Sequence, residues 1–581
     1  MLKKLLVYLK DYKKESVLGP LFKLLEASFE LIVPLVMAAI IDYGIAQANR
    51  GYIVKMCFLL LLLGVVGLVC SITAQYFAAK ASVGFAKQLK HALFAHIQGL
   101  SFSEVDSIGT STLITRMTSD MNQVQAGVNL TLRLLLRSPF VVFGAMIMAF
   151  TIDVQAALVF VVSIPLLSIV VAGVMVWCIP GYKRVQSHLD RVLAATRENL
   201  AGVRVIRAFC KEKEEMEEFE RRNRMLTDIQ KKVGHVSSLM NPLTYVIINL
   251  AIVALVWVGA IKVNAGLLTQ GAVVALYNYM SQILVELIKL ANLILNVTKS
   301  IACGNRIQSV LEVQSSMPVQ GYGQDDAEPD EKADAVVFRS VCLTYRDGGD
   351  EALTNIDFQV KRGQTVGIIG GTGSGKSSLV QLIPRFYDTT KGEVLVDGVN
   401  VKQYSPKRLR QKVAIVLQKA VLFQGTIREN MRWGRRDASD EEIYRALDAA
   451  QAREIVEGKD GGLDFEIEQG GRNLSGGQRQ RLTIARALVR KPEILILDDS
   501  ASALDFATDA ALRHAIRELG GQLTVFIVSQ RASSIQYADQ IIVLEDGAVA
   551  GIGTHSELLQ SCEVYQEIYY SQFKKEERAN G

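Results

Sequence analysis

Long apolar runs recur six times over roughly the first 300 residues of the chain. Each run is long enough to cross a bilayer core of about 30 Å, which needs a helix of about 20 residues. Met56–Ala79, Val154–Tyr182 and Val236–Ile261 contain no charged residue, so a membrane span is most strongly indicated there. The predicted spans lie at Val17–Ile45, Met56–Ala79, Val128–Ile152, Val154–Pro180, Val236–Ile261 and Gly271–Val297.

The polar stretches between the runs predict their orientation. Two connections, Lys80–Gly127 and Gly181–His235, are long, helix-favouring and rich in Lys and Arg, whereas the others are short. Five lysines precede the first run, and the positive-inside rule then places the N-terminus and both long connections in the cytoplasm. We expect the spans to continue there as paired helices. The N-terminus lacks a cleavage site, which favours an amphipathic surface helix over a signal peptide.

The second half of the chain follows another pattern. Val310–Asp334 is polar and acidic and predicts an exposed linker. Beyond it, short β-rich runs alternate with helical patterns, which is typical of a soluble α/β domain. We expect an all-α transmembrane domain over 1–312, a linker over 313–334, an α/β domain over 335–575 and a polar tail over 576–581. The clearest strands are predicted at Thr365–Ile369, Val413–Leu417, Ile494–Leu497 and Thr524–Val528.

Composition excludes several other classes of protein. Half of the 581 residues are hydrophobic and only 21% are charged, which excludes disordered and fully soluble chains and leaves the bilayer as partner. The balance of 64 basic and 59 acidic residues gives no reason to expect nucleic acid as a partner. Seven cysteines without a CxxC pair do not form a disulfide or zinc framework, and we predict that they are inert packing residues.

The sequence from Gly370 to Ser377 matches the phosphate-binding pattern GxxxxGK[ST], between an apolar strand and the helical pattern SLVQLIPRF. Glycines let backbone N–H groups surround phosphate oxygens, Lys376 supplies a charge to the β and γ phosphates, and Ser377 offers its hydroxyl to Mg²⁺. Asp498 ends a predicted strand where a carboxylate should meet the magnesium shell. The domain is therefore predicted to bind ATP and Mg²⁺ through Gly370, Gly371, Thr372, Gly373, Ser374, Gly375, Lys376, Ser377, Ser378 and Asp498.

The most specific motif lies between these two segments: Leu474, Ser475, Gly476, Gly477 and Gln478, followed by RQRLTIARALVRKPE. On this motif the chain resembles the ATP-binding cassette (ABC) family, whose signature is LSGGQ. The six spans ahead of one cassette resemble an exporter half-transporter, a six-helix transmembrane domain followed by an α/β P-loop domain.

The resemblance assigns roles to further residues. It implies that Tyr345 stacks on adenine, that Gln418 reaches Mg²⁺ with Ser377 and Asp498 and senses the γ phosphate, and that Ser502–Asp505, ending in Asp505, is the D-loop. It also implies that Asp106–Arg116 and Asn199–Phe209 hold the coupling helices that touch the cassettes. The alternative is that both stretches form ordinary solvated helices.

Two catalytic positions depart from the family pattern. Asp499 stands in place of the Glu that polarises the attacking water, and Gln530 stands in place of the switch His. A shorter carboxylate reaches less far, and Gln cannot carry charge. The pattern resembles the degenerate-site subunit of bacterial heterodimeric multidrug exporters, whose intact signature serves the partner's active site. The alternative is drift in a still-active enzyme.

Charged residues inside the spans are candidates for substrate contacts. Glu26 and Glu30 lie four residues apart and so share one face of the first span, where they would suit cationic or amphipathic substrates. The alternative is pairing with charges such as Arg133 and Arg137 of the third span.

The function predicted from the sequence is ATP-driven export of drugs or other amphipathic compounds by one half of a heterodimer. The ATPase is coupled to transport, with hydrolysis mainly at the partner's site. The chain is expected to be a multi-pass protein of a bacterial plasma membrane, with its nucleotide-binding domain in the cytoplasm. The alternatives are a homodimeric exporter of lipids or small peptides and a nucleotide-gated membrane regulator.

Overall fold

A computed structural model describes residues 2–317, 330, 332–345, 349–500, 503–519 and 523–573. Most of the predicted linker and the polar tail lie outside these residues. The chain divides into two compact units. The first consists of Met1–Gln98 and Thr110–Val313, and the second of Gly99–Gly109 and Gln314–Gly581.

The first unit is helical. Among the described residues, six helical segments are long and apolar enough to span a membrane, as predicted. Its elements are α1 (Leu2–Leu5), η1 (Leu6–Tyr12), α2 (Lys13–Ala39), η2 (Ile40–Ile45), α3 (Arg50–Gly99), α5 (Thr110–Thr115), η3 (Arg116–Asp120), α6 (Met121–Leu134), α7 (Arg137–Ile152), α8 (Val154–Ala201), α9 (Val203–Ala208), α10 (Glu212–Ser238), α11 (Met240–Asn264) and α12 (Gln270–Leu311).

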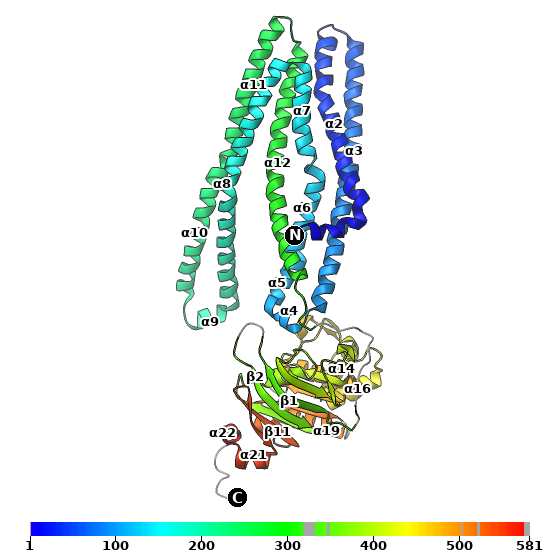
Figure 1. The fold of residues 1–581 in the computed structure, drawn as a ribbon, viewed down its shortest axis with the longest axis vertical. Helices are drawn as coiled ribbons and strands as arrows, with labels where there is room; N and C mark the ends of the chain where they lie inside the picture. Colours follow the sequence, from blue (N-terminus) through cyan, green and yellow to red (C-terminus); the bar gives the residue numbers. More distant parts are fainter. Residues whose placement is uncertain are drawn as a thin grey trace. The chain divides into compact units, whose positions relative to one another are not determined.

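The long polar connections extend the spans as helices. Helix α8 continues without a break from the apolar run into the charged segment, and α10 returns beside it after the short helix α9 (Figure 1). Helix α3 likewise continues to Gly99. The predicted pairing is therefore confirmed for α8 and α10, and the helical continuation is confirmed for α3.

Small side chains bring the spans of the first unit close together. Its largest buried cluster contains many alanines from α2, α7, α8, α11 and α12, packed around Phe160, Leu255 and Tyr279. Close backbone approach through small residues is how helices associate in a solvent as apolar as themselves. Tyr279 is fully buried, and its hydroxyl donates to the carbonyl of Leu31 at 2.6 Å. This bond ties α12 to α2.

The cysteines follow the packing prediction only in part. Cys70 and Cys178 are buried, but Cys57 and Cys210 are exposed. Cys57 lies on the face of α3 where large apolar side chains such as Phe58 and Leu61 are also exposed. That face needs an apolar solvent, which a bilayer supplies.

The second unit is an α/β domain. Its elements are α4 (Phe102–Ile108), β1 (Val336–Leu343), β2 (Leu353–Val360), β3 (Thr365–Gly370), α13 (Lys376–Leu382), β4 (Lys391–Val396), β5 (Val399–Asn400), α14 (Pro406–Lys412), β6 (Val413–Val416), β7 (Gly425–Thr426), α15 (Ile427–Arg432), α16 (Asp440–Ala449), α17 (Arg453–Glu457), η4 (Gly462–Asp464), β8 (Glu466–Ile467), η5 (Gln469–Gly471), α18 (Gly476–Val489), β9 (Ile494–Asp498), α19 (Phe506–Glu518), β10 (Thr524–Val528), α20 (Ala532–Ile535), β11 (Gln540–Glu545), β12 (Ala548–Gly553), α21 (His555–Ser561) and α22 (Glu563–Gln572).

The four predicted strands are confirmed, and they lie in one sheet with strand order β12-β11-β3-β10-β9-β6. Strands β11, β3, β10, β9 and β6 are parallel, so their carboxyl ends share one edge. The helix after the P-loop is shorter than the predicted pattern and ends at Leu382. Pro384 explains this end, because a proline has no N–H to continue the helical hydrogen-bond ladder and its ring crowds the carbonyl four residues earlier. A second sheet has the order β2-β1-β4-β5.

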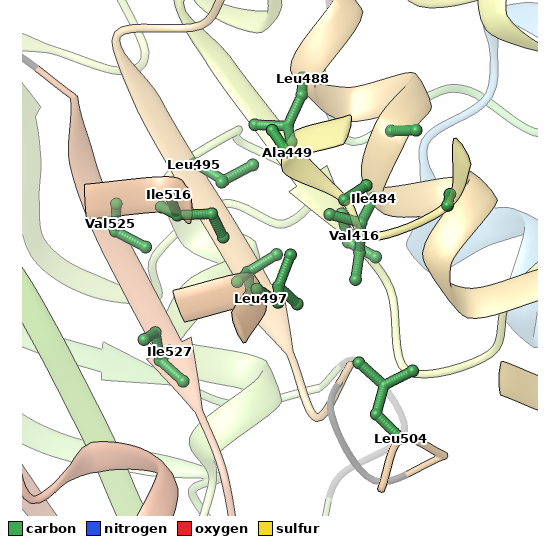
Figure 2. Packing of buried hydrophobic residues seen from close by; sticks show 14 of the residues in the cluster. Val416, Ala449, Ile484, Leu488, Leu495, Leu497, Leu504, Ile516, Val525 and Ile527 are labelled. Atoms are coloured by element: carbon green, nitrogen blue, oxygen red, sulfur yellow. The ribbon is translucent and has the colours of Figure 1, made fainter. Parts of the chain in front are cut away.

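The central strands are apolar throughout because both of their faces are buried. Side chains of a strand alternate between faces, so Leu495 and Leu497 enter one core, whereas Ile494 and Ile496 enter the other. Figure 2 shows the first core, where these leucines meet side chains of β10, α18 and α19. This double packing makes the sheet a rigid support for the loops at its carboxyl edge.

Candidate functional site

The P-loop begins where β3 ends. Gly373 and Gly375 have φ angles of 87° and 89°, which favour glycine. A Cβ atom at Gly375 would lie 2.7 Å from the carbonyl oxygen of Ala352, and one at Gly370 would lie 2.2 Å from that of Leu544. Gly370, Gly373 and Gly375 are thus required by the geometry of the loop, whereas a side chain at Gly371 would meet no neighbour.

The side chain of Lys376 folds back onto the P-loop. Its Nζ donates to the carbonyl oxygens of Gly370 at 2.9 Å and Gly371 at 2.5 Å, and it lies 3.4 Å from Ser374 Oγ. Burial lowers the pKa of Lys376, against the opposing charges of Asp499 and Asp498. An anionic phosphate at this position would restore a full counter-charge to the ammonium group.

The oxygen donors expected around Mg²⁺ are gathered at the carboxyl edge of the sheet. Ser377 Oγ donates to Asp498 Oδ1 at 2.9 Å, and Asp498 is 2% exposed. Burial raises the pKa of Asp498. Mg²⁺ prefers hard oxygen ligands and commonly takes one or two from protein and others from phosphate. A hydroxyl, a carboxylate and the carboxamide of Gln418 in one pocket fit this ion.

Parallel pairing of β9 with β10 brings the two unusual residues to the same edge, since Asp498 is in register with Val528. Asp499 has a φ of 46°, and its backbone N–H donates to the Val528 carbonyl at 3.0 Å. Gln418 Nε2 donates to Asp499 Oδ2 at 3.2 Å. Gln530 lies two residues after the end of β10 and lines the same pocket as Gln418 and Asp499. Asp499 and Gln530 thus line one pocket, close to the carboxyl ends of β9 and β10.

Tyr345 lies at another part of the same pocket. It is 40% exposed, its hydroxyl lies 2.8 Å from Ser378 Oγ, and its ring meets that of Tyr387 edge to face at 5.2 Å. A partly exposed ring fixed at its edge and its hydroxyl leaves a face for stacking.

One pocket of about 350 Å³ unites most of the predicted nucleotide-binding residues. Gly370, Gly371 and Ser374 do not line it but support it through Lys376. Three lining residues were not predicted from the sequence: Ala352, Val528 and Ser529 belong to no motif, although Val528 and Ser529 directly precede Gln530. The lining residues are Tyr345, Ala352, Thr372, Gly373, Gly375, Lys376, Ser377, Ser378, Gln418, Asp498, Asp499, Val528, Ser529 and Gln530.

The signature motif does not line this pocket. It opens α18, where Ser475 and Gln478 form a capping box: Ser475 Oγ accepts from the Gln478 N–H at 3.2 Å, and Gln478 Oε1 accepts from the Ser475 N–H at 3.0 Å. Gly476 and Gly477 therefore present a helix N-terminus, which attracts anions. Within one chain this anion-attracting end and the P-loop belong to separate sites.

Asp505 caps the next helix, α19. Its carboxylate accepts from the Thr508 N–H at 2.9 Å and from the Thr508 hydroxyl at 2.8 Å. The bond from the Thr508 amide is the largest cause that lowers the pKa of Asp505. Ser502, the first residue of the predicted D-loop, lies outside the described residues.

A segment of the first long connection belongs to the second unit. In α4, Asp106 accepts a hydrogen bond from the Tyr387 hydroxyl at 2.8 Å, and the ring of Phe102 lies 4.6 Å from that of Phe386. Burial raises the pKa of Tyr387 and Asp106 adds to the effect. The Tyr387 ring also contacts that of Tyr345, which lines the nucleotide pocket, so Tyr387 and Tyr345 connect α4 to this pocket. No sequence motif marks Tyr387, because the residues that it contacts, Asp106 and Tyr345, lie far from it in the chain.

Several charges inside the spans are paired, among them Arg137 but not Arg133 in the ion pairs of the described residues. Lys23 Nζ lies 2.5 Å from Glu26, while Arg137 bridges Glu30 at 2.6 Å and Glu286 at 2.5 Å. Glu286 is 3% exposed, but the side chain of Glu30 is 42% exposed. Pairing therefore leaves Glu30 accessible and Glu26 largely covered.

Comparison with known proteins agrees with this geometry. The family model for the ABC transporter transmembrane region matches residues 16–287, and the ABC transporter model matches residues 353–502. An uncharacterized ABC transporter ATP-binding protein of Mycobacterium tuberculosis is 35% identical over 571 residues, which cover 97% of each chain. The ATP-dependent lipid A-core flippase of Escherichia coli is 30% identical over 564 residues, which cover 97% of this chain and 96% of the flippase.

The fold is also similar to that of a bacterial Atm1-family ABC exporter solved with ATP bound. The TM-score is 0.80 at 22% identity, over 97% of this chain and 98% of the exporter. Together with the P-loop, the signature motif and six helical segments able to span a membrane, these relatives show that the chain belongs to the ABC transporter family, as an exporter with its transmembrane and ATP-binding domains in one chain.

Proposed function

We propose that this exporter chain works as the degenerate-site half of a heterodimer. Its own P-loop holds ATP and supports slow hydrolysis, while its signature motif completes the competent site of a second half-transporter. The observation that carries the proposal is the pair Asp499 and Gln530 at one end of an otherwise intact pocket.

Asp499 in place of Glu and Gln530 in place of His are each expected to lower the rate of ATP hydrolysis. Phosphoryl transfer depends on positioning and electrostatics, and a loss of roughly 1 Å of reach at the group that orients water can cost about 100-fold in rate. Asp499 is one methylene shorter than Glu, and its carboxylate accepts a hydrogen bond from Gln418. Gln530 can donate a hydrogen bond to a γ phosphate but supplies neither charge nor a proton shuttle.

The other residues of the pocket keep their binding roles. Lys376 meets the phosphates, Tyr345 offers a stacking face, and Ser377 with Asp498 holds the magnesium position. When bound, Mg²⁺ neutralises charge on the phosphates. Because the binding residues are intact and the two hydrolytic positions are altered, we expect this site to close on ATP and to reopen slowly.

The test compares ATPase activity of the purified chain alone with that of the chain co-expressed with a half-transporter encoded beside its gene. We expect little activity alone and robust, substrate-stimulated activity in the pair. The double variant Asp499→Glu, Gln530→His should raise the activity of the lone chain. Full activity of the unaltered lone chain would instead establish a homodimeric pump.

We propose amphipathic cations as the substrate class, because the Glu30 carboxylate stays accessible although it is paired with Arg137. A lipid substrate is the second candidate, favoured by the similarity to the lipid A-core flippase. Stimulation of ATPase activity by a quaternary ammonium amphiphile and its loss in Glu30→Gln would support the first. Stimulation by lipid alone, unchanged in Glu30→Gln, would support the second. A bacterial plasma membrane with the cassette in the cytoplasm is the proposed location.

A further inference from the structure

The last residue of α22, Gln572, reaches the loop that carries Gln530. Gln572 Nε2 donates to the backbone carbonyl of Gln530 at 2.7 Å, and Gln572 Oε1 accepts from the backbone N–H of Ala532 at 2.9 Å. A carbonyl can only accept and an N–H can only donate, so a single orientation of the carboxamide satisfies both bonds. One side chain therefore holds the backbone on both sides of Arg531.

Helix α22 is well anchored for this task. It packs against α20, β3 and β11. Tyr565 is fully buried in the core, and its hydroxyl lies 2.8 Å from His555 Nδ1. The rings of Tyr569 and Phe573 pack at 4.6 Å on either side of Gln572 in the sequence. Gln572 thus projects from a fixed support.

On the pocket side, the start of the loop is held by the sheet. The Ser529 N–H donates to the Ile368 carbonyl at 3.1 Å, which continues the pairing of β10 with β3. Beyond Ser529 the chain leaves the sheet, and the Arg531 N–H turns back to Ser529 Oγ at 2.9 Å. Gln530 lies at this turn, where its direction depends on how the carbonyl and the following N–H are held.

We propose that Gln572 is a positioning residue for Gln530: its carboxamide fixes the loop so that the Gln530 side chain faces the γ phosphate. The inference rests on the role proposed above for Gln530 in the nucleotide pocket. It makes α22, far along the chain from the P-loop, part of the apparatus that distinguishes a triphosphate from a diphosphate.

The proposal predicts a selective defect. In the proposed role, Gln530 faces the γ phosphate, which ADP lacks, whereas Tyr345 would stack on the adenine that ATP and ADP share. Loosening the loop should therefore weaken triphosphate binding and spare ADP. A merely structural role for α22 would weaken both nucleotides together.

The experiment measures binding of AMP-PNP and of ADP, each with Mg²⁺, to the full-length purified chain by isothermal titration. The variants are Gln572→Leu, which removes both bonds, and Gln572→Glu, which keeps the acceptor for Ala532 and loses the donor to Gln530. Gln566→Leu is the matched control, since Gln566 lies on the same helix and donates to the Leu559 carbonyl at 2.9 Å instead. Gln530→Ala reports the full contribution of Gln530.

We expect both Gln572 variants to bind AMP-PNP about fivefold more weakly, with ADP binding within about twofold of wild type, and Gln530→Ala to show at least the same loss. Gln566→Leu should match wild type. The nearly isosteric Gln572→Glu carries the test if the leucine variant unfolds. Equal loss for both nucleotides, or unchanged AMP-PNP binding in the Gln572 variants, would overturn the proposal. Unchanged binding in Gln530→Ala would overturn it through its premise, while leaving the ATPase comparison of lone chain and pair unaffected.

Discussion

At the scale of single residues, Glu104 shows how one buried carboxylate organises a segment. It is 2% exposed and accepts from the backbone N–H of Ser101 at 3.1 Å and of Ser316 at 3.3 Å. Burial alone would raise the pKa of Glu104, but the bonds from Ser101 and Ser316 outweigh it, so the pKa lies below its usual value. Glu104 therefore joins α4 to the chain that follows the last span.

We expect Glu104→Gln to lower the midpoint of thermal unfolding at pH 7 by about 3 °C, because the amide loses an acceptor while a buried N–H stays unpaired. The lowered pKa means that the carboxylate stabilises the fold above the pKa of the unfolded chain and loses this effect as pH falls through the folded value. The difference between wild type and variant should shrink in acid. Glu441→Gln, at an exposed ion pair with Arg445, is the control and should not move the midpoint.

Arg137 is the second residue whose loss should be costly. It neutralises Glu286, which is buried, and bridges it to Glu30. Arg137→Met leaves a buried carboxylate with less compensation, which typically costs about 3 kcal/mol or more. Thermal unfolding in detergent should show a clear loss. Lys289→Met removes the more exposed partner of Glu286 and should have a much smaller effect. Equal effects of the two variants would contradict this account.

At the scale of elements, α4 contacts the rest of the second unit through the Asp106–Tyr387 hydrogen bond, the bond from Ser316 to Glu104 and the ring contacts of Phe102. Tyr387→Phe removes the bond to Asp106 and keeps the rings of Phe102 and Phe386 together. Loss of about 1 kcal/mol should speed amide hydrogen exchange in Phe102–Ile108 by about fivefold. Tyr404→Phe is the matched control, since the buried Tyr404 hydroxyl donates to the Val396 carbonyl. Exchange in α4 that responds equally to both variants would show a general loosening.

The elements were predicted from the sequence wherever one physical signal dominated. Span length and charge patterning predicted the six helical segments. Apolar runs predicted the four central strands, because a strand that is buried on both faces must be apolar throughout. The contacts of Tyr387, Glu104 and Gln572 were not predicted. Each joins segments far apart in the chain through ordinary polar residues, and nothing in the local sequence marks such pairs.

At the scale of the whole molecule, the proposed asymmetry predicts that substitutions in the P-loop and in the signature motif of this chain lower the ATPase activity to different extents. Lys376→Met disables the P-loop, whereas Gly476→Asp places a carboxylate at the signature motif, where a Cβ atom meets no neighbour within 4 Å. In the assembled transporter we expect Gly476→Asp to remove most ATPase activity, at least about tenfold, and Lys376→Met to remove less than half. Similar losses from both variants would indicate two equivalent sites.

The strand order also has a consequence for how the chain is made. Strand β3, which ends in the P-loop, pairs with β10 and β11, whose paired residues come 160 and 174 positions later. Pairings between such distant segments cannot form until the later strands exist. On the ribosome, the spans would already be complete while the P-loop strand still lacks both neighbours. A chain truncated before β10 therefore carries every membrane segment but no finished ATP site, so an interrupted product reaches the bilayer as a passive bundle of helices that cannot use ATP.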